Sequence, residues 1–176
     1  MLVETVVGPV LERIGADWEH GRIALSQVYM SGRICEDIVN SLLPPAGVHR
    51  KDQPTMAIAV LEDHHGLGKR IVSSTLRASG FVLADYGHGV TAPTLARKAA
   101  DEGIEVLLIS TLMLRSAHRV FDVRTKLDQL GCKVKIVVGG APFLFDSRLW
   151  QEVGADAMGK SASDAVSIVT QIAAHT

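Results

Sequence analysis

The chain has 176 residues, of which 47% are hydrophobic, 21% charged and 5% aromatic, a globular composition that excludes wholesale disorder. Lys and Arg number 18 against 19 Asp and Glu, so a net charge of −1 argues against general attraction to nucleic acid or anionic membrane. With no apolar run near the roughly 20 residues of a membrane span, no basic leader and only two cysteines, we expect a cytoplasmic protein without disulfides.

Before the proline pair at 44–45, the sequence predicts two helices and no strand. Their predicted ranges are 2–16 and 23–42, with a turn at 17–21. In the second helix Ile34, Ile38 and Leu42 recur at helical spacing and form one apolar stripe. Two helices cannot bury both faces alone, so they must pack on the rest of the chain, a second copy or a partner.

The stretch 44–54 has the proline-rich composition of a linker. We therefore expect a helical segment at 1–43, a linker at 44–54 and a second domain at 55–176.

In the second domain, short apolar runs alternate with helical patterns. The predicted strands are 56–61, 81–85, 105–109, 134–138 and 155–158, and the predicted helices are 67–79, 92–102, 115–130, 146–153 and 163–174. Strands interleaved with helices predict an α/β fold with a parallel sheet covered on both faces. Ligands of such sheets bind at the carboxyl ends of the strands, so informative residues should follow the strands.

Asp63 and His65 follow the first predicted strand. A histidine there is placed to bind a metal, and an aspartate two residues earlier can hold its other ring nitrogen and fix the tautomer. A simple polar loop is the alternative for these two residues alone. Zinc is disfavoured because no further His or Cys cluster follows a predicted strand.

Gly139 and Gly140 follow the fourth predicted strand. They allow a ligand to approach the backbone, although a plain turn would also explain them. The chain has neither a GxGxxG pattern after its first strand nor a P-loop, so an ordinary nucleotide site has little support.

Three motifs in this order resemble those of the cobalamin-binding domain in corrinoid proteins of methyltransferase systems and in methionine synthase. They are Asp63-x-His65-x-x-Gly68, Ser110-x-Leu112 and Gly139-Gly140. The resemblance implies a five-stranded parallel, Rossmann-like (flavodoxin-like) domain. Residues 14–43 are similar to the last two helices of the helical cap that precedes this domain in the family.

The resemblance implies a cobalamin or related corrinoid cofactor, with its own base detached from cobalt (base-off) and His65 as the lower axial ligand (His-on). Asp63 would hold His65, and Ser116 would extend this relay. The residues that would line the slot for the nucleotide tail are Gly68, Ser110, Leu112, Gly139, Gly140 and Ala162. Trp18 and Leu25 would cover the upper face of the corrin.

The implied function is to carry a methyl group from a substrate:corrinoid methyltransferase to a second methyltransferase, whose acceptor is tetrahydrofolate or a thiol. No nucleophile with a base beside it is evident, so we expect a carrier subunit without an independent catalytic site. The implied partners are these methyltransferases, and the sequence does not name the methyl donor.

Other functions remain as alternatives. The small subunit of an adenosylcobalamin-dependent mutase shares the motifs but lacks the cap. A cobalamin-dependent sensor carries Glu-His where this chain has Val28-Tyr29. A flavodoxin-like domain that has lost cobalamin is the last alternative.

The chain departs from the family pattern in three ways. Leu114 stands where the family has a threonine, and His64 replaces an apolar residue. Only two of the usual four cap helices fit before Pro44. The chain is then either a compact variant or one whose bundle is completed by another chain, as in a homodimer through the cap.

Overall fold

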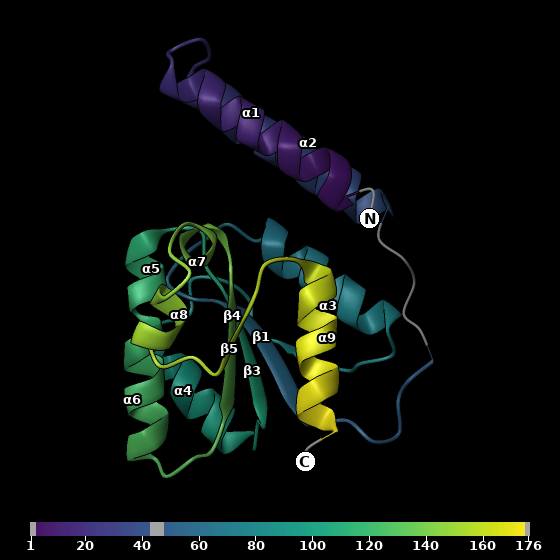
Figure 1. Ribbon diagram of the computed structural model, residues 1–176, viewed down its shortest axis with the longest axis vertical. Helices are drawn as coiled ribbons and strands as arrows, with labels where there is room; N and C mark the ends of the chain where they lie inside the picture. The colour runs from purple at the N-terminus through teal and green to yellow at the C-terminus, as the bar shows by residue number, and fades with distance from the viewer. Residues whose placement is uncertain (1–2, 43–47, 175–176) are drawn as a thin grey trace. The chain divides into compact units, whose positions relative to one another are not determined.

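The computed structural model describes residues 3–42 and 48–174, which fall into two compact units (Figure 1). The first unit comprises residues 1–43 and the second residues 44–176. No helix in the described ranges is both long and apolar enough to cross a membrane.

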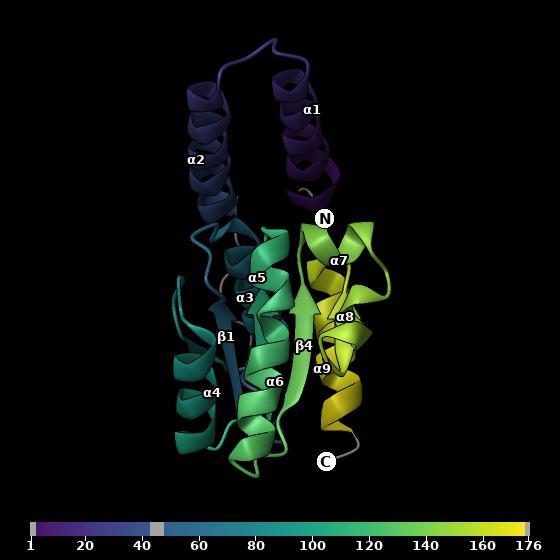
Figure 2. The ribbon, with the colours of Figure 1, turned by 90° about the vertical axis from the view of Figure 1, so that its left-hand side faces the viewer.

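The first unit is a helical hairpin. A π-helical turn, η1 (Val3–Val7), leads into α1 (Gly8–Glu19), which packs beside α2 (Leu25–Leu42) (Figure 2). Helix α1 continues through Gly15, where the sequence predicted an end, and stops before Gly21 at a φ of 66°. A glycine in the left-handed region is a common helix terminator, whereas one inside a helix only weakens it.

The second unit contains a five-stranded sheet in the order β2-β1-β3-β4-β5, with every pairing parallel. The strands are β1 (Met56–Val60), β2 (Ala84–Asp85), β3 (Val106–Ser110), β4 (Lys135–Gly139) and β5 (Ala157–Gly159). Every residue of β1 is buried, as its apolar run predicted. The predicted parallel α/β fold is confirmed.

Helices cover both faces of this sheet (Figures 1 and 2). The helices are α3 (Leu67–Ala78), α4 (Ala92–Asp101), α5 (Leu114–His118), α6 (Val120–Gln129), α7 (Ala141–Phe145), α8 (Leu149–Glu152) and α9 (Ala162–Ala173). Helices α3 and α9 pack together on one face, and α4 and α6 on the other. Each face has its own apolar core, so the unit has three layers.

The second strand is shorter than its predicted range of 81–85. Phe81 and Leu83 are buried, but the ladder to β1 begins only at Ala84. The reason is that the N–H of Val82 donates to the side chain of Gln53 at 2.6 Å instead of to a neighbouring strand.

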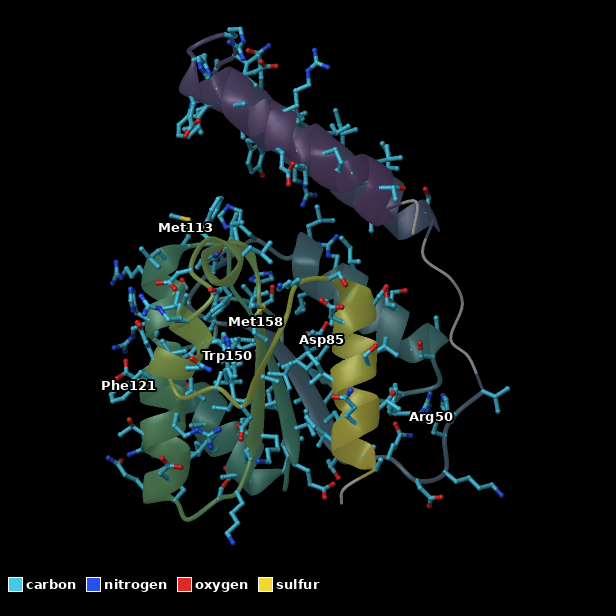
Figure 3. The ribbon with its side chains drawn as sticks, in the orientation of Figure 1. Arg50, Asp85, Met113, Phe121, Trp150 and Met158 are labelled. Atoms are coloured by element: carbon cyan, nitrogen blue, oxygen red, sulfur yellow. The ribbon has the colours of Figure 1, made fainter. Side chains whose placement is uncertain are left out.

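The last part of the predicted linker lies along this same edge. The N–H of Arg50 donates to Gly80 O at 2.9 Å, and its guanidinium lies 4.3 Å from the ring centroid of Phe81 (Figure 3). Residues 48–54 therefore belong to the α/β unit as a bound strap. The rest of the predicted linker, 44–47, lies outside the described residues.

Two predicted helices differ from the structure. The helix expected at 115–130 breaks at Arg119 into α5 and α6. The helix expected at 146–153 is present in shortened form as α8. Helix α7 was not predicted, and it begins directly after Gly140 with Pro142 in its first turn. Proline suits a helix start because its missing N–H would have no partner there.

Candidate functional site

The predicted site residues of the second unit meet at the carboxyl edge of the sheet. Strand β1 lies between β2 and β3, so the chain passes from β1 to one neighbour and then returns to the other. This change of direction separates the loops that follow β1 and β3 and opens the edge between them to a ligand.

Asp63 fastens the loop after β1 to the loop after β3. Its Oδ1 accepts the N–H groups of His64 at 2.7 Å and His65 at 3.0 Å, while Oδ2 accepts those of Leu112 at 2.9 Å and Met113 at 3.0 Å. Met113 is labelled at this edge in Figure 3. The carboxylate is buried, so its main-chain partners hold it in one orientation.

The same contacts keep Asp63 ionised. Burial alone would raise the pKa of Asp63, but hydrogen bonds from the His65 side chain and from the N–H groups of Leu112, His65 and Met113 outweigh it. The resulting pKa is about 2. At neutral pH the group is therefore a carboxylate, which can only accept hydrogen bonds.

His65 presents one ring nitrogen outward. Its Nδ1 lies 2.5 Å from Asp63 Oδ1, and because the carboxylate only accepts, Nδ1 carries the proton and donates. Nε2 is then the nitrogen with the lone pair, on a side chain that is 58% exposed. An imidazole whose Nδ1 is fixed in this way can bind a metal through Nε2.

His65 has no companion ligands close by. In the described part of the chain, no group of three or more His, Cys, Asp or Glu side chains could hold a metal ion. A metal bound at His65 would therefore need most of its ligands from a cofactor.

Small residues border the edge on the face covered by α3 and α9. A Cβ at Gly68, in the first turn of α3, would lie 3.4 Å from Ser110 Oγ. A Cβ at Gly139 would lie 3.2 Å from the main-chain oxygen of Gly159. These small residues therefore let α3 approach the end of β3, and let β4 approach the end of β5, near the start of α9 at the buried Ala162.

Gly140 is needed for the turn between β4 and α7. At a φ of 123°, a Cβ at Gly140 would lie only 1.7 Å from Thr111 O. Glycine is thus required for β4 to turn into α7 against the loop after β3. Gly159 ends β5 and pairs with Gly139 at the end of β4.

Ser116 lies beneath the loop after β1. Its buried hydroxyl donates to the main-chain oxygen of Glu62 at 3.0 Å, and not to the Asp63 carboxylate. Its part in a relay stays a prediction. Leu112 is 45% exposed beside the same loop.

Two further histidines were not brought together by sequence reasoning. Nδ1 of His64 lies 3.2 Å from Nδ1 of His88, which follows β2. The His64 ring also packs closely on Gly89. A Cβ added at Gly89 would lie only 2.7 Å from Cε1 of His64. His64 therefore packs on the loop after β2 and points away from the Asp63–His65 pair.

Trp18 and Leu25 belong to the helical unit. Trp18 is 48% exposed near the end of α1, and Leu25 is 65% exposed at the start of α2. Both side chains are available to cover a ligand, and that role stays a prediction.

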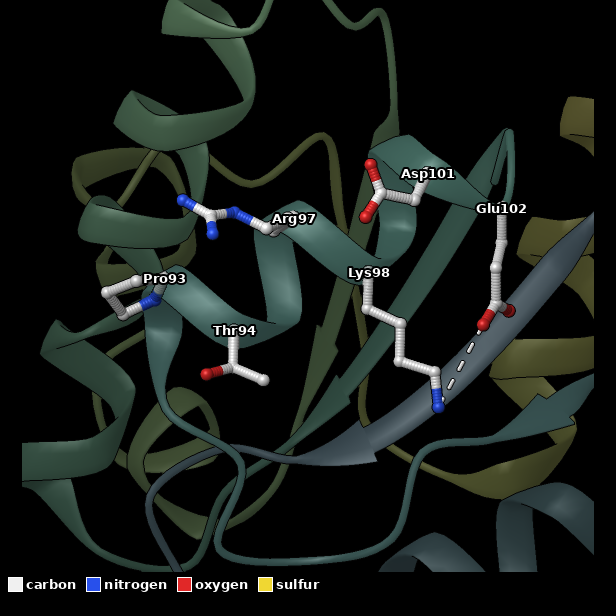
Figure 4. A pocket seen from close by; sticks show the side chains of 6 residues that line it. All are labelled: Pro93, Thr94, Arg97, Lys98, Asp101 and Glu102. Atoms are coloured by element: carbon white, nitrogen blue, oxygen red, sulfur yellow. Dashed lines mark ion pairs between the residues drawn. The ribbon is translucent and has the colours of Figure 1, made fainter.

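A separate hollow lies along α4 (Figure 4). Its lining residues are Pro93, Thr94, Arg97, Lys98, Asp101 and Glu102. Helix α4 supplies all of them except Glu102, which follows it directly, and none is a predicted site residue. Lys98 lies 3.9 Å from Glu102 and 4.0 Å above the Tyr86 ring, so its charge already has partners. We therefore assign the site to the carboxyl edge.

The chain matches a known protein family and several curated relatives. The family described as "B12 binding domain" matches residues 54–169. Monomethylamine corrinoid protein 2 of Methanosarcina barkeri is 33% identical over 168 residues, covering 90% of this chain and 76% of that protein.

Two solved structures also match. The Methanosarcina barkeri monomethylamine corrinoid protein superposes with a TM-score of 0.77 at 27% identity, over 92% of this chain and 78% of that one. The methanol:cobalamin methyltransferase complex MtaBC from the same organism gives a TM-score of 0.61 at 25% identity, over 99% of this chain and 67% of that one.

Proposed function

Because the chain belongs to the B12-binding domain family, we propose that it holds cobalamin or a related corrinoid and carries a methyl group between two methyltransferases. The observation that carries the proposal is the Asp63–His65 pair, whose 2.5 Å contact leaves a lone-pair nitrogen at an exposed edge. We place this carrier in the cytoplasm, as its composition suggests.

The residues present suit such a cofactor. His65 would be the lower axial ligand of cobalt, with the cofactor's own base detached, and Asp63 would keep its tautomer. The slot for the nucleotide tail would be bordered by Gly68, Ser110, Leu112, Gly139, Gly140 and Ala162. Gly68 and Gly139 have no side chains that would obstruct a ligand approaching the main chain at this edge.

The cofactor, when bound, supplies the cobalt that accepts and releases the methyl group. The protein's own part is to orient and protect it. The Asp63 carboxylate, ionised at a pKa of about 2, would hold Nδ1 of His65 and so orient Nε2 toward the cofactor. Trp18 and Leu25 would exclude water from the upper face.

Electron paramagnetic resonance tests the ligand directly. The protein is loaded with cob(II)alamin in unlabelled form and with ¹⁵N-labelled histidine. We expect the axial nitrogen splitting to change with the label and to lose this change in His65→Ala. Asp101→Asn, on exposed α4, is the control and should keep it. A splitting that ignores the protein label would refute the proposed ligation.

The carrier role needs a transfer assay. The relatives are named for methylamines and the matching complex for methanol, so these are the first donors we propose to test. Protein loaded with methylcobalamin should pass its methyl group to a thiol or tetrahydrofolate when a methyltransferase is added. Turnover with adenosylcobalamin in its place would favour a mutase subunit.

We also propose that two copies associate through their helical units. The apolar side chains of Met30, Ile34 and Ile38 follow one another at four-residue spacing and are 55%, 54% and 46% exposed. A hairpin of two helices gains stability when a second hairpin completes a four-helix bundle.

The mass in solution tests this association. Light scattering should show a dimer for the protein and a monomer for Ile34→Lys, with Lys51→Ala, on the α/β unit, as the control. A monomeric wild-type protein at all concentrations tested would exclude this dimer.

A further inference from the structure

Glu62 has an unusual backbone conformation beside the Asp63–His65 pair. Its φ is 45°, and it is the only non-glycine residue with a positive φ among the described residues. Such a conformation is unfavourable for a residue with a Cβ, because the Cβ crowds the main chain. Strain of this kind persists only where the surroundings hold it, and it is concentrated at functional sites.

The surroundings hold both main-chain groups of Glu62. Its N–H donates to Val90 O at 3.0 Å, in the loop before α4. Its carbonyl oxygen accepts the hydroxyl of the buried Ser116 on α5 at 3.0 Å. The peptide planes on either side of the strained residue are therefore fixed by the loop before α4 and by helix α5.

The side chain adds a third anchor. Arg119 Nε donates to the two carboxylate oxygens of Glu62 at 3.3 and 3.2 Å, and the N–H of Ala92 donates to Oε1 at 3.3 Å. Arg119 is itself held in an ion pair with Asp122. It stands at the break between α5 and α6, and the break turns it toward Glu62.

The strained residue determines where the next residues point. After Glu62, the main-chain oxygen of Asp63 accepts the N–H of Gly89 at 2.7 Å, and its carboxylate reaches the loop after β3. We propose that Glu62, clamped by Arg119 and Ser116, is a positioning residue that aims His65 at its ligand through Asp63. The part of this inference that concerns cobalamin ligation rests on the proposed function. The orientation of His65 in the cofactor-free protein does not.

Nitrogen-15 NMR of the His65 ring gives a readout that loss of stability alone would not move. In the unloaded protein we expect the proton on Nδ1, bound to Asp63. In Glu62→Ala and Arg119→Gln the Nε2–H tautomer should become the major form. The matched control is Arg97→Gln, which removes an exposed arginine from α4 and should leave the tautomer unchanged.

Glu62→Gly separates the effect of the Glu62–Arg119 contact, the clamp, from that of the strained backbone at residue 62. Glycine adopts a positive φ without penalty but carries no carboxylate for Arg119. If the clamp aims His65, this variant should be folded and still shift to the Nε2–H tautomer. If it keeps the wild-type tautomer, the clamp only compensates for the strain and the proposal is overturned.

The loaded protein supplies the second readout. The share of cob(II)alamin ligated by His65 should fall about tenfold in Arg119→Gln, in line with the effect of residues that support a metal-bound histidine. Unchanged ligation in both Arg119→Gln and Glu62→Gly would refute the inference. Failure of the wild-type protein to ligate cobalamin would instead refute the proposed function, and the unloaded protein would still test the clamp.

Discussion

Lys69 is a buried cation in the first turn of α3. It forms an ion pair with Asp85 at the end of β2, and Asp85 is labelled in Figure 3. Burial alone would raise the pKa of Asp85, but the hydrogen bonds from Lys69 and from the N–H of Gly87 lower it below its usual value. The pair joins a helix to the edge strand. Its strength therefore depends on pH.

Asp85→Asn tests this dependence. Because the pKa of Asp85 is lower in the folded state, the stabilisation is present above the unfolded pKa of about 3.9 and disappears as the pH falls through the folded value. At pH 7 we expect the variant to lose about 1–3 kcal/mol of unfolding free energy.

Urea unfolding measured from pH 7 to pH 3 gives this difference. It should shrink below about pH 4, because protonated aspartic acid no longer differs in charge from asparagine. The exposed Asp101→Asn is the control and should follow the wild-type curve. A difference that stays constant with pH would contradict this account.

Gly140 and Gly131 form a matched pair of glycines with φ values of 123° and 69°. Gly131→Ala places a Cβ with no atom within 4 Å, so we expect a loss of about 1 kcal/mol from the backbone alone. Gly140→Ala drives a Cβ against Thr111 O, so we expect a loss of about 3 kcal/mol or more. Equal losses in urea unfolding would exclude this close contact.

The Asp63–His65 pair could be predicted because its members are two residues apart and follow a recognisable strand. The Glu62–Arg119 contact could not, because 57 residues separate its members and the helix break that turns Arg119 is set by tertiary packing. The positive φ of Glu62 could not be predicted from the sequence either, because glutamate does not favour this conformation.

At the scale of elements, the apolar runs predicted the central strands, but they did not predict the length of the edge strand β2. The strands β1, β3 and β4 are apolar because helices cover both their faces. Phe81 and Leu83 look equally apolar, yet the strap at 48–54 takes the place where they would extend β2. Composition indicated a linker at 44–54 but not the contacts of the strap.

Arg50 fastens the strap. Its Nε donates to Ser79 O at 3.0 Å, in addition to the contact of its guanidinium with Phe81. We expect Arg50→Ala to lower the unfolding free energy by about 1–2 kcal/mol. The neighbouring exposed Lys51→Ala should change it by less than about 0.5 kcal/mol. Chemical denaturation of both variants tests the strap, and equal effects would show that it contributes nothing.

At the scale of the whole molecule, the two units differ in how much interior they have. Both apolar cores belong to the α/β unit. In the helical unit, the buried hydrophobic residues of the described ranges are Val7, Cys35 and Val39. The sequence indicated this contrast through the change of pattern at Pro44, but what covers the helices does not follow from local pattern.

Separating the units tests their independence. Residues 48–176 alone should fold and unfold cooperatively, because they contain the complete sheet and its covering helices. Residues 1–42 alone should be largely unfolded in dilute solution, since short helices without a packed face are marginal in water. Circular dichroism of the two pieces decides this, and an uncooperative α/β piece would contradict it.

The sheet ends on both sides in very short strands, two residues in β2 and three in β5. Strands this short offer a neighbouring chain few open backbone groups for pairing. Another protein therefore has little opportunity to extend the sheet, and recognition must rely on side chains of helices and loops. The same brevity protects a crowded solution of this protein from edge-to-edge growth into fibres.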